Sequence, residues 1–229
     1  MKVSIIVPVF NEEKTLVLII SHLQKLPFEK EIIIVDDCSQ DFSFDTAKKL
    51  EEEDSQIRVI RLEKNHGKGA AVRTGIEHST GEIIVVQDAD LEYHPNDLIT
   101  LVSIIKAGKA TVVFGSRYLS KQNDEGYLLH RLGNFVFTWF SNRVTGLNLT
   151  DVTTCYRVCH KEIFEIVTIE ERRFGIEVEL VGKIGRLYRK GKCRIQEVPI
   201  RYFPRGFSEG KKITWKDSLS LLKAIVKYR

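Results

Sequence analysis

The sequence has no apolar run that approaches the ~20 consecutive residues needed for a membrane-spanning helix. It is also poor in proline, with 5 residues among 229, while hydrophobic residues make up 43% and charged residues 29%. These proportions are those of an ordinary globular chain and exclude a disordered chain or a mini-protein. The first residues, MKVSIIVPVF, pass directly into NEEK without a small-residue cleavage site, which predicts a strand rather than a signal peptide. We therefore expect a chain that stays in the cytoplasm and contains an α/β domain.

Cysteine and surplus charge are scarce as well. The cysteines are Cys38, Cys155, Cys159 and Cys193, and the closest pair has neither CxxC spacing nor histidine partners. This spacing does not fit a zinc site, so we predict reduced and mostly buried thiols. Lysine plus arginine number 35 against 31 for aspartate plus glutamate, a formal charge of +4. So small a surplus does not demand a nucleic-acid partner, and we expect none.

Short apolar runs rich in β-branched residues alternate with amphipathic stretches, which predicts parallel βαβ units. The predicted strands are residues 3–9, 31–35, 57–62, 82–87 and 111–115, with a late strand within 193–203. The predicted helices are residues 45–53, 69–78 and 95–106, and one that Asn11 caps and that runs through Leu23.

Two later stretches are amphipathic and basic. Residues 131–144 place Phe135, Trp139 and Phe140 among basic and polar residues, which fits either a helix packed on the sheet or one that meets a membrane surface. Residues 214–229 have the same two interpretations. We accordingly divide the chain into a main domain over 1–212 and a C-terminal amphipathic helix over 213–229.

An acidic motif directly follows the predicted strand 82–87. Asp88, Asp90 and Glu92 alternate along it, and residues two apart in extended backbone point the same way. Oxygen ligands on a short segment suit Mg²⁺ or Mn²⁺, which share the phosphates of a nucleotide. Capping of the next helix would account for one of these carboxylates and not for all of them. The motif therefore predicts a metal and phosphate site at the carboxyl edge of the sheet.

Other strand ends carry polar groups at the same edge. Residues 8–13 and the pair Asp36 and Asp37 stand where a base and a ribose could be hydrogen-bonded, although the pair could also simply begin a loop. Residues 65–70 form a glycine-bearing turn that opens a helix, where backbone N–H groups and Lys68 can face phosphate. This turn matches neither the phosphate-loop pattern nor the dinucleotide fingerprint.

Five motifs taken together resemble glycosyltransferase family 2. They are VPVFNEE at 7–13, VDDCSQD at 35–41, NHGKGAAVRTG at 65–75, DADLE at 88–92 and GSRY at 115–118. The similarity is greatest to its dolichyl-phosphate mannosyltransferase and polyprenyl-phosphate glycosyltransferase branch. Later motifs extend the resemblance over nearly the whole chain: HRLGN at 130–134, DVTTCYR at 151–157, FGIEVEL at 174–180 and EVPIRYFPR at 197–205. The resemblance implies a GT-A fold, which is Rossmann-like with a mostly parallel sheet flanked by helices. It also implies a nucleotide-sugar donor (GDP-mannose, or UDP-glucose), Mg²⁺ or Mn²⁺, inversion at the anomeric carbon and a polyprenyl phosphate acceptor.

The resemblance also assigns site residues by position. The nucleoside would be bound by Pro8, Phe10, Glu12, Val35 and Asp37, and the ribose and diphosphate by Asp88, Ala89 and Asp90. Lys68, Arg205 and Lys211 would meet the donor phosphates, and the metal would be held by Asp88, Asp90 and Glu92. An anionic acceptor phosphate would need cations to position it, and our candidates are Arg117 and Arg131 because arginine forms forked hydrogen bonds to phosphate. The predicted catalytic residues are then Asp90, Arg117 and Arg131.

The chain departs from the family pattern at a few positions. Glu92 stands where many relatives have glutamine, and Cys155 stands where the pattern usually has glycine. Ser208 and Gly210 exchange their usual order, so the loop over the donor could close differently.

Alternatives to transfer onto a lipid phosphate remain open. Transfer to a sugar hydroxyl would need a general base, which Asp151, Glu177 or Glu179 could supply. A non-catalytic nucleotide-sugar-binding subunit is a further possibility. A lipid acceptor would require a membrane surface or a membrane-anchored partner.

Overall fold

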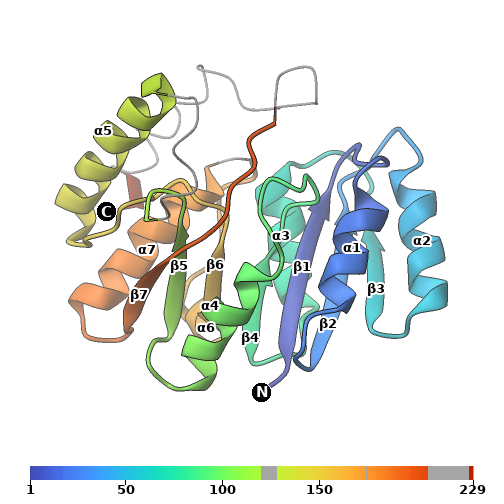
Figure 1. Cartoon of the computed structure of the whole chain (residues 1–229), viewed down its shortest axis with the longest axis horizontal. Helices are drawn as coiled ribbons and strands as arrows, with labels where there is room; N and C mark the ends of the chain where they lie inside the picture. The colour runs from blue at the N-terminus through green and yellow to red at the C-terminus, as the bar shows by residue number, and fades with distance from the viewer. Residues whose placement is uncertain (120–127, 174, 206–226, 229) are drawn as a thin grey trace.

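The computed structural model describes residues 1–119, 128–173, 175–205 and 227–228, and only the backbone of residues 128–132 (Figure 1). Within this part of the chain, a seven-stranded sheet has the strand order β3-β2-β1-β4-β6-β5-β7. The strands are β1 (Val3–Val9), β2 (Lys30–Asp36), β3 (Ile57–Arg61), β4 (Ile83–Val86), β5 (Val112–Ser116), β6 (Arg157–His160) and β7 (Ile195–Pro199). The helices are α1 (Leu16–Gln24), α2 (Ser43–Glu53), α3 (Lys68–Glu77), α4 (Asp97–Lys106), α5 (Leu128–Thr145), α6 (Glu162–Ile166) and α7 (Ile176–Arg189).

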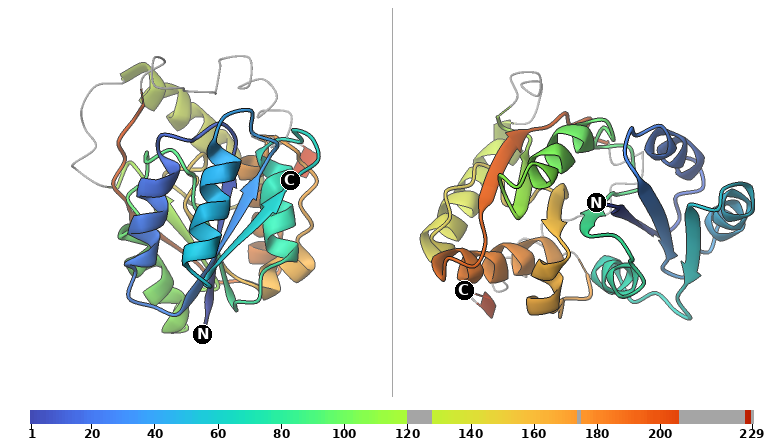
Figure 2. Two further views of the ribbon diagram at one scale, coloured as in Figure 1. Left: turned by 90° about the vertical axis from the view of Figure 1, so that its right-hand side faces the viewer. Right: turned by 90° about the horizontal axis from the view of Figure 1, so that it is seen from below.

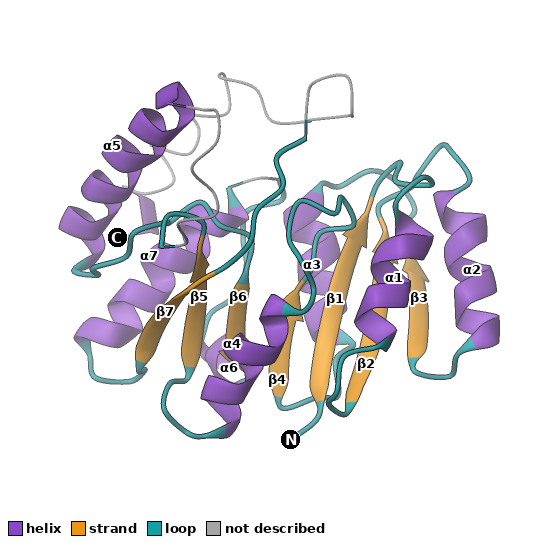
Figure 3. Cartoon of the chain, in the orientation of Figure 1, coloured by secondary structure: helices purple, strands orange, loops and turns teal. Residues whose placement is uncertain are grey.

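The sheet is parallel except for β6, which runs antiparallel to both β4 and β5. Helices cover both of its faces, with α1 and α4 on one face and α3, α6 and α7 on the other (Figures 2 and 3). The predicted α/β class, with a mostly parallel sheet flanked by helices, is confirmed. Among the described residues, no helix combines the length and the apolar composition that crossing a membrane requires.

Alternation along the central strands builds a core on each face of the sheet. In β1, Val3, Ile5 and Val7 join the cluster that includes the buried face of α1, whereas Ile6 faces α3. Helix α3 packs so closely on β1 that a Cβ atom at Gly75 would lie 2.4 Å from the Ile6 side chain. The central strands are therefore buried on both faces, which is why their sequences read as nearly continuous apolar runs.

Some local predictions need correction. Asn11 does not cap α1, because the helix begins at Leu16 with Thr15 in the capping position and Asn11 has a φ of 55°. Strand β6 and helices α6 and α7 have no counterpart among the predicted elements. Strand β6 is only 4 residues long, too short to show a periodic pattern. The predicted helix over 213–229 lies outside the described residues, apart from Lys227 and Tyr228.

The cysteine prediction is confirmed. All four thiols are free, and Cys155, Cys159 and Cys193 are buried while Cys38 is half-buried.

A half-buried carboxylate at the opposite edge of the sheet makes the fold sensitive to acid. Glu31 accepts hydrogen bonds from the Ser4 hydroxyl at 2.5 Å, the Lys2 ammonium at 3.1 Å and the Thr80 backbone N–H at 2.6 Å. Burial opposes its ionisation, but these hydrogen bonds outweigh burial and lower the pKa of Glu31 from 4.5 to about 2. The folded state therefore binds the proton more weakly than the unfolded chain does, and this stability is present above pH 4.5 and lost as pH falls toward 2.

We expect Glu31→Gln to lower the free energy of unfolding by about 2 kcal/mol at pH 7 and by much less near pH 3. Urea unfolding of the metal-free protein at both pH values measures this difference. Glu29→Gln removes the same charge from an exposed position in the preceding turn and is expected to change neither value. An equal loss of stability at both pH values would contradict the assignment.

Candidate active site

Backbone strain gathers at the carboxyl edge of three adjacent strands, at the top of Figure 1. Cys38, Asn11 and Leu91 follow β2, β1 and β4, and they have φ angles of 61°, 55° and 61°. In the described part of the chain these are the non-glycine residues with positive φ. Such a conformation costs about 1–3 kcal/mol and persists where surrounding structure enforces it, often at functional sites. The strained positions lie beside the polar groups that the sequence places at this edge.

The pair Asp36 and Asp37 organises the loops on the β2 side of the edge. Asp37 accepts the backbone N–H groups of His66 and Gly67, both at 2.7 Å. Asp36 accepts the backbone N–H of Ser39 at 3.2 Å and forms an ion pair with Arg61 at 3.4 Å. Both carboxylates are thus already engaged by protein groups, and contact of Asp37 with a nucleoside stays a prediction.

The glycine-bearing turn at 65–70 is covered by a segment far along the chain. A Cβ atom at Gly67, whose φ is +91°, would lie 2.5 Å from the Arg172 carbonyl oxygen. That oxygen also accepts the Ala70 N–H at 3.2 Å. Since His66 and Gly67 donate to Asp37, the expectation that the N–H groups of this turn face phosphate is wrong for His66, Gly67 and Ala70.

Lys68 points from the start of α3 toward the acidic motif. Its Nζ atom lies 2.8 Å from Asp88 Oδ1, 2.8 Å from Glu177 Oε1 and 2.9 Å from Cys155 Sγ. Burial alone would lower the pKa of Lys68, but the neighbouring carboxylates outweigh burial and raise it, so the ammonium stays charged. Burial also raises the pKa of the Cys155 thiol, which stays protonated and donates to Asp88 Oδ2 at 2.5 Å. Contact of Lys68 with donor phosphate remains a prediction.

Asp90 lies beside the negative charges of the other two carboxylates of the acidic motif. Burial and the negative charges of Asp88 and Glu92 raise the pKa of Asp90 from 3.8 to about 7. Its Oδ1 atom accepts the Glu92 N–H at 3.1 Å, and Glu92 accepts the Arg205 N–H at 3.0 Å. The carboxylates are close enough to repel one another, and a cation between them would relieve that repulsion.

The residues of the acidic motif fit Mg²⁺ or Mn²⁺ as part of a shared site. Within the described ranges, no three His, Cys, Asp or Glu side chains are gathered into a ready-made metal centre. Mg²⁺ is usually bound by one or two carboxylates together with substrate phosphates, not by an all-protein cage. The hard oxygen donors of Asp88, Asp90 and Glu92 suit that arrangement, and their ligation of a metal stays a prediction.

Arg205 connects the segment after β7 to the acidic motif. Its Nε–H donates to the Asp90 carbonyl at 2.5 Å, and its guanidinium lies 3.1 Å from Glu12 Oε2. Tyr202, in the same segment, donates to Glu92 at 3.4 Å. The structure thus brings Glu12 and Arg205, both predicted donor-binding residues, into direct contact beside the predicted metal ligands.

Arg117 forms a buried ion pair on the other side of the site. Its Nε and Nη2 atoms donate to the two oxygens of Asp151 at 2.7 and 2.8 Å, and Nη2 also donates to Thr153 at 2.7 Å. The guanidinium carbon lies 5.1 Å from the centre of the Tyr202 ring. Asp151 is fully buried, while 15% of the Arg117 side chain is exposed. This fork geometry holds the guanidinium rigidly at the edge of the sheet.

For the remaining predicted site residues, the structure gives mainly their burial. Val35 is fully buried in the core that faces α3, so only its backbone can meet a nucleoside. Ala89 is also buried, whereas Pro8 and Phe10 are half-buried at the end of β1. The Arg131 side chain and all of Lys211 lie outside the described residues.

Each residue considered as a general base is already bound by a cation. Asp151 pairs with Arg117 and Glu177 with Lys68. Glu179 is fully buried, accepts the N–H groups of Glu170 and Glu171 at 2.8 Å each, and pairs with Lys183 at 2.7 Å. The pair of Glu179 with Lys183 has the i,i+4 spacing of a helix and could be predicted from the sequence. The partners of Asp151 and Glu177 lie on distant segments, which no local pattern marks.

Comparisons with known proteins identify the family of the chain. Residues 4–167 match the profile described as Glycosyl transferase family 2. Undecaprenyl-phosphate mannosyltransferase of Micrococcus luteus is 30% identical over 219 residues, which cover 92% of this chain and 87% of that protein. Dodecaprenyl-phosphate galacturonate synthase of Rhizobium johnstonii is 28% identical over 181 residues, which cover 76% of this chain and 53% of that protein.

Solved structures of low sequence identity share the fold. Glucosyl-3-phosphoglycerate synthase from Mycobacterium tuberculosis, in complex with Mg²⁺ and uridine diphosphate, superimposes with a TM-score of 0.72. The match covers 99% of this chain and 79% of that chain at 18% identity. It confirms the predicted GT-A fold.

Proposed function

The chain belongs to glycosyltransferase family 2, and from that premise we propose that it transfers a hexose, with inversion, from a nucleotide sugar to a polyprenyl phosphate. The observation that carries the proposal is the acidic motif at the edge of the sheet, with Asp90 beside Asp88 and Glu92. The names of both curated relatives contain a polyprenyl phosphate but different sugars, which supports the acceptor class more than the sugar.

A phosphate acceptor agrees with the way the carboxylates are held. A phosphate monoester has a second pKa near ~6 and is largely ionised at neutral pH, so its oxygen can attack the anomeric carbon without a protein base. Transfer to a neutral hydroxyl would need a general base, and the residues considered for that role are all paired with cations: Asp151, Glu177 and Glu179. The structure therefore gives no specific support to a hydroxyl acceptor. In this reaction a new bond forms from the acceptor oxygen to the anomeric carbon, and the bond to the donor diphosphate breaks.

The protein's part in this reaction is to bind and orient both phosphates. Arg117 and Arg131 would hold the acceptor phosphate, and Lys68, Arg205 and Lys211 would hold the donor diphosphate. Asp88, Asp90 and Glu92 would hold Mg²⁺ or Mn²⁺, which stabilises negative charge on the leaving diphosphate. Pro8, Phe10, Glu12, Val35, Asp37 and Ala89 would surround the nucleoside and ribose.

Among donors we favour GDP-mannose, with UDP-glucose as the alternative. The mannosyltransferase of Micrococcus luteus, at 30% identity, supports mannose, and the motif resemblance supports the same sugar. Incubation of the protein and Mn²⁺ with each labelled donor, and with undecaprenyl phosphate or a free glycan as acceptor, tests the proposal. Labelled lipid with GDP-mannose is the expected product, whereas a labelled glycan or no transfer with any donor would contradict it.

Thermal unfolding in the presence of nucleotides tests the donor separately. A ligand that binds only the folded state raises the unfolding temperature by mass action. We expect GDP with Mn²⁺ to raise it and UDP with Mn²⁺ to leave it unchanged. The opposite pattern would assign a uridine donor.

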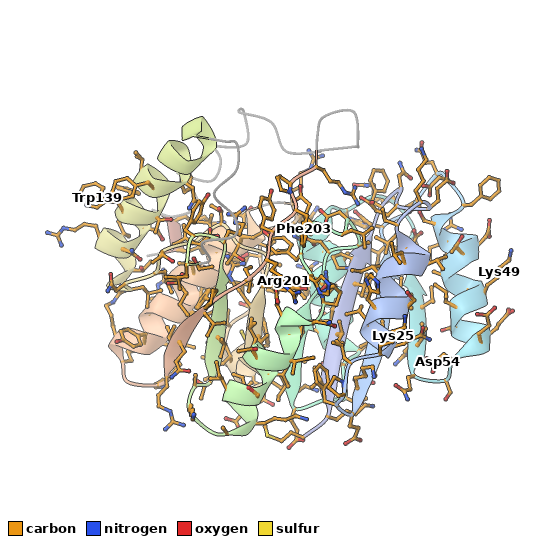
Figure 4. All side chains as sticks on the ribbon, viewed as in Figure 1. Lys25, Lys49, Asp54, Trp139, Arg201 and Phe203 are labelled. Carbon is orange, nitrogen blue, oxygen red and sulfur yellow. The ribbon has the colours of Figure 1, made fainter. Side chains whose placement is uncertain are left out.

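We also propose that the chain acts at the cytoplasmic face of a membrane through α5. Phe137, Phe140 and Val144 of this helix pack toward α7. Phe135, Val136 and Trp139 project from the other side with 67%, 55% and 61% of their surfaces exposed, and Figure 4 shows Trp139 pointing outward. Exposed aromatic residues on an amphipathic helix are typical of binding at a lipid interface.

The double variant Phe135→Ser and Trp139→Ser is expected to lose most binding to vesicles of phosphatidylcholine and phosphatidylglycerol, because it removes the largest exposed apolar side chains of α5. Flotation of the protein with the vesicles measures this loss. Phe42→Ser, at an equally exposed position before α2, serves as the matched control and should float like the wild type. Equal flotation of all variants would contradict the role of α5.

A further inference from the structure

A single buried ammonium lies between two carboxylates from different elements of the fold. Lys68 Nζ is 2.8 Å from Asp88 Oδ1 and 2.8 Å from Glu177 Oε1. Lys68 begins α3, Asp88 follows β4, and Glu177 lies in the first turn of α7. Only 14%, 18% and 12% of the respective side chains are exposed, so water screens their attraction weakly. The three side chains therefore form one charged unit with a net charge of about −1 at neutral pH.

Both oxygens of Asp88 take part in this unit. Lys68 Nζ also lies 2.9 Å from Asp88 Oδ2, and the Cys155 thiol donates to the same oxygen at 2.5 Å. A carboxylate has about four lone-pair positions, so the contacts of Lys68 with both oxygens and of Cys155 with one leave about one position for another cation. If Asp88 alone neutralised the ammonium, however, it would attract a divalent cation only weakly. Glu177 binds the same ammonium from the other side and offsets part of its positive charge.

We propose that Glu177 is a positioning residue, which by sharing the ammonium of Lys68 leaves Asp88 negative enough to bind a divalent cation. This inference rests on the proposed function, in which Asp88 helps to hold the metal. In this role Glu177 acts through Lys68 and is not itself a metal ligand. The arrangement joins α3, β4 and α7 in orienting one metal ligand, as partners outside the ligand shell commonly do.

Mn²⁺ binding in the absence of donor and acceptor tests this role directly. Electron paramagnetic resonance of the unbound ion gives the dissociation constant for each variant. Glu177→Gln keeps the shape and the hydrogen bond to Lys68 but removes the charge, and we expect it to weaken Mn²⁺ binding by about tenfold. Glu177→Asp keeps the charge and is expected to restore most of the affinity.

Lys68→Met distinguishes this role from a merely structural one. It removes the positive charge beside Asp88, so Mn²⁺ should bind at least as tightly as to the wild type. In the Lys68→Met background, Glu177→Gln should no longer weaken Mn²⁺ binding, because the two residues act as a unit. Glu77→Gln, an exposed charge change on α3, is the matched control and should leave Mn²⁺ binding unchanged.

The outcomes separate this inference from the proposed function. Unchanged Mn²⁺ affinity in Glu177→Gln, or an equal loss with and without Lys68, would overturn the positioning role while leaving the metal site in place. Mn²⁺ binding undetectable even in the wild type would instead overturn the proposed metal site, and the inference with it. If Glu177→Gln does not fold, weaker binding by folded Lys68→Met than by the wild type would overturn the inference.

Discussion

Asp90→Ala is expected to lower sugar transfer about 1,000-fold or more, while the protein still folds. Asp90 is central in the acidic motif, and loss of a metal ligand removes several kcal/mol of stabilisation from the leaving diphosphate. Steady-state transfer with saturating Mn²⁺ measures the effect. Since the substitution removes one of three mutually repelling carboxylates, the metal-free variant should unfold at or above the wild-type temperature.

Two controls make the Asp90 result specific to the metal site. Asp45→Ala removes an exposed carboxylate from the first turn of α2 and should leave transfer unchanged. Mn²⁺ should raise the unfolding temperature of the wild type and of Asp45→Ala but not of Asp90→Ala. Normal turnover by Asp90→Ala would refute the metal assignment, and so would an undiminished Mn²⁺ shift.

Arg117→Met is expected to lower transfer at least about 100-fold and the free energy of unfolding by about 3 kcal/mol. The first effect follows from losing a forked contact to the acceptor phosphate. The second follows because Asp151 is fully buried and would keep an unpaired charge. Transfer assays and urea unfolding measure the two effects independently.

The double variant Arg117→Met and Asp151→Asn separates binding from folding. Replacing Asp151 as well removes the unpaired charge, so we expect most of the lost stability to return. Transfer should stay low, because the guanidinium is still missing. Recovery of transfer together with stability would mean that Arg117 serves only to hold Asp151.

Much of the fold is predictable because its signals are local. Strand β1 coincides with the predicted range, and most other predicted strands end within a residue or two of the observed bounds. Apolar runs between polar turns are enough to locate buried parallel strands. Strand β6 was missed because its 4 residues are too few to show a periodic pattern, and its antiparallel direction depends on where the chain returns to the sheet, between β4 and β5.

The candidate site, too, was predictable from the sequence only in part. The acidic motif was recognisable, since its carboxylates follow one strand within a few residues. The partners that hold the site residues were not, because Lys68 meets Glu177, Arg205 meets Glu12, and Asp37 meets the turn at 65–70 across the fold. The same reason explains why N–H groups expected to face phosphate are instead bound by Asp37 and Arg172.

By itself, then, the sequence determined the α/β class, the family and the position of the acidic motif after β4, because each depends on neighbouring residues and their order. Only the tertiary structure decided which charges neutralise one another. Ion pairs such as Arg117 with Asp151 and Lys68 with Glu177 join segments that are far apart along the chain. No local pattern encodes such a pair, since its energy depends on the distance and burial that folding alone creates.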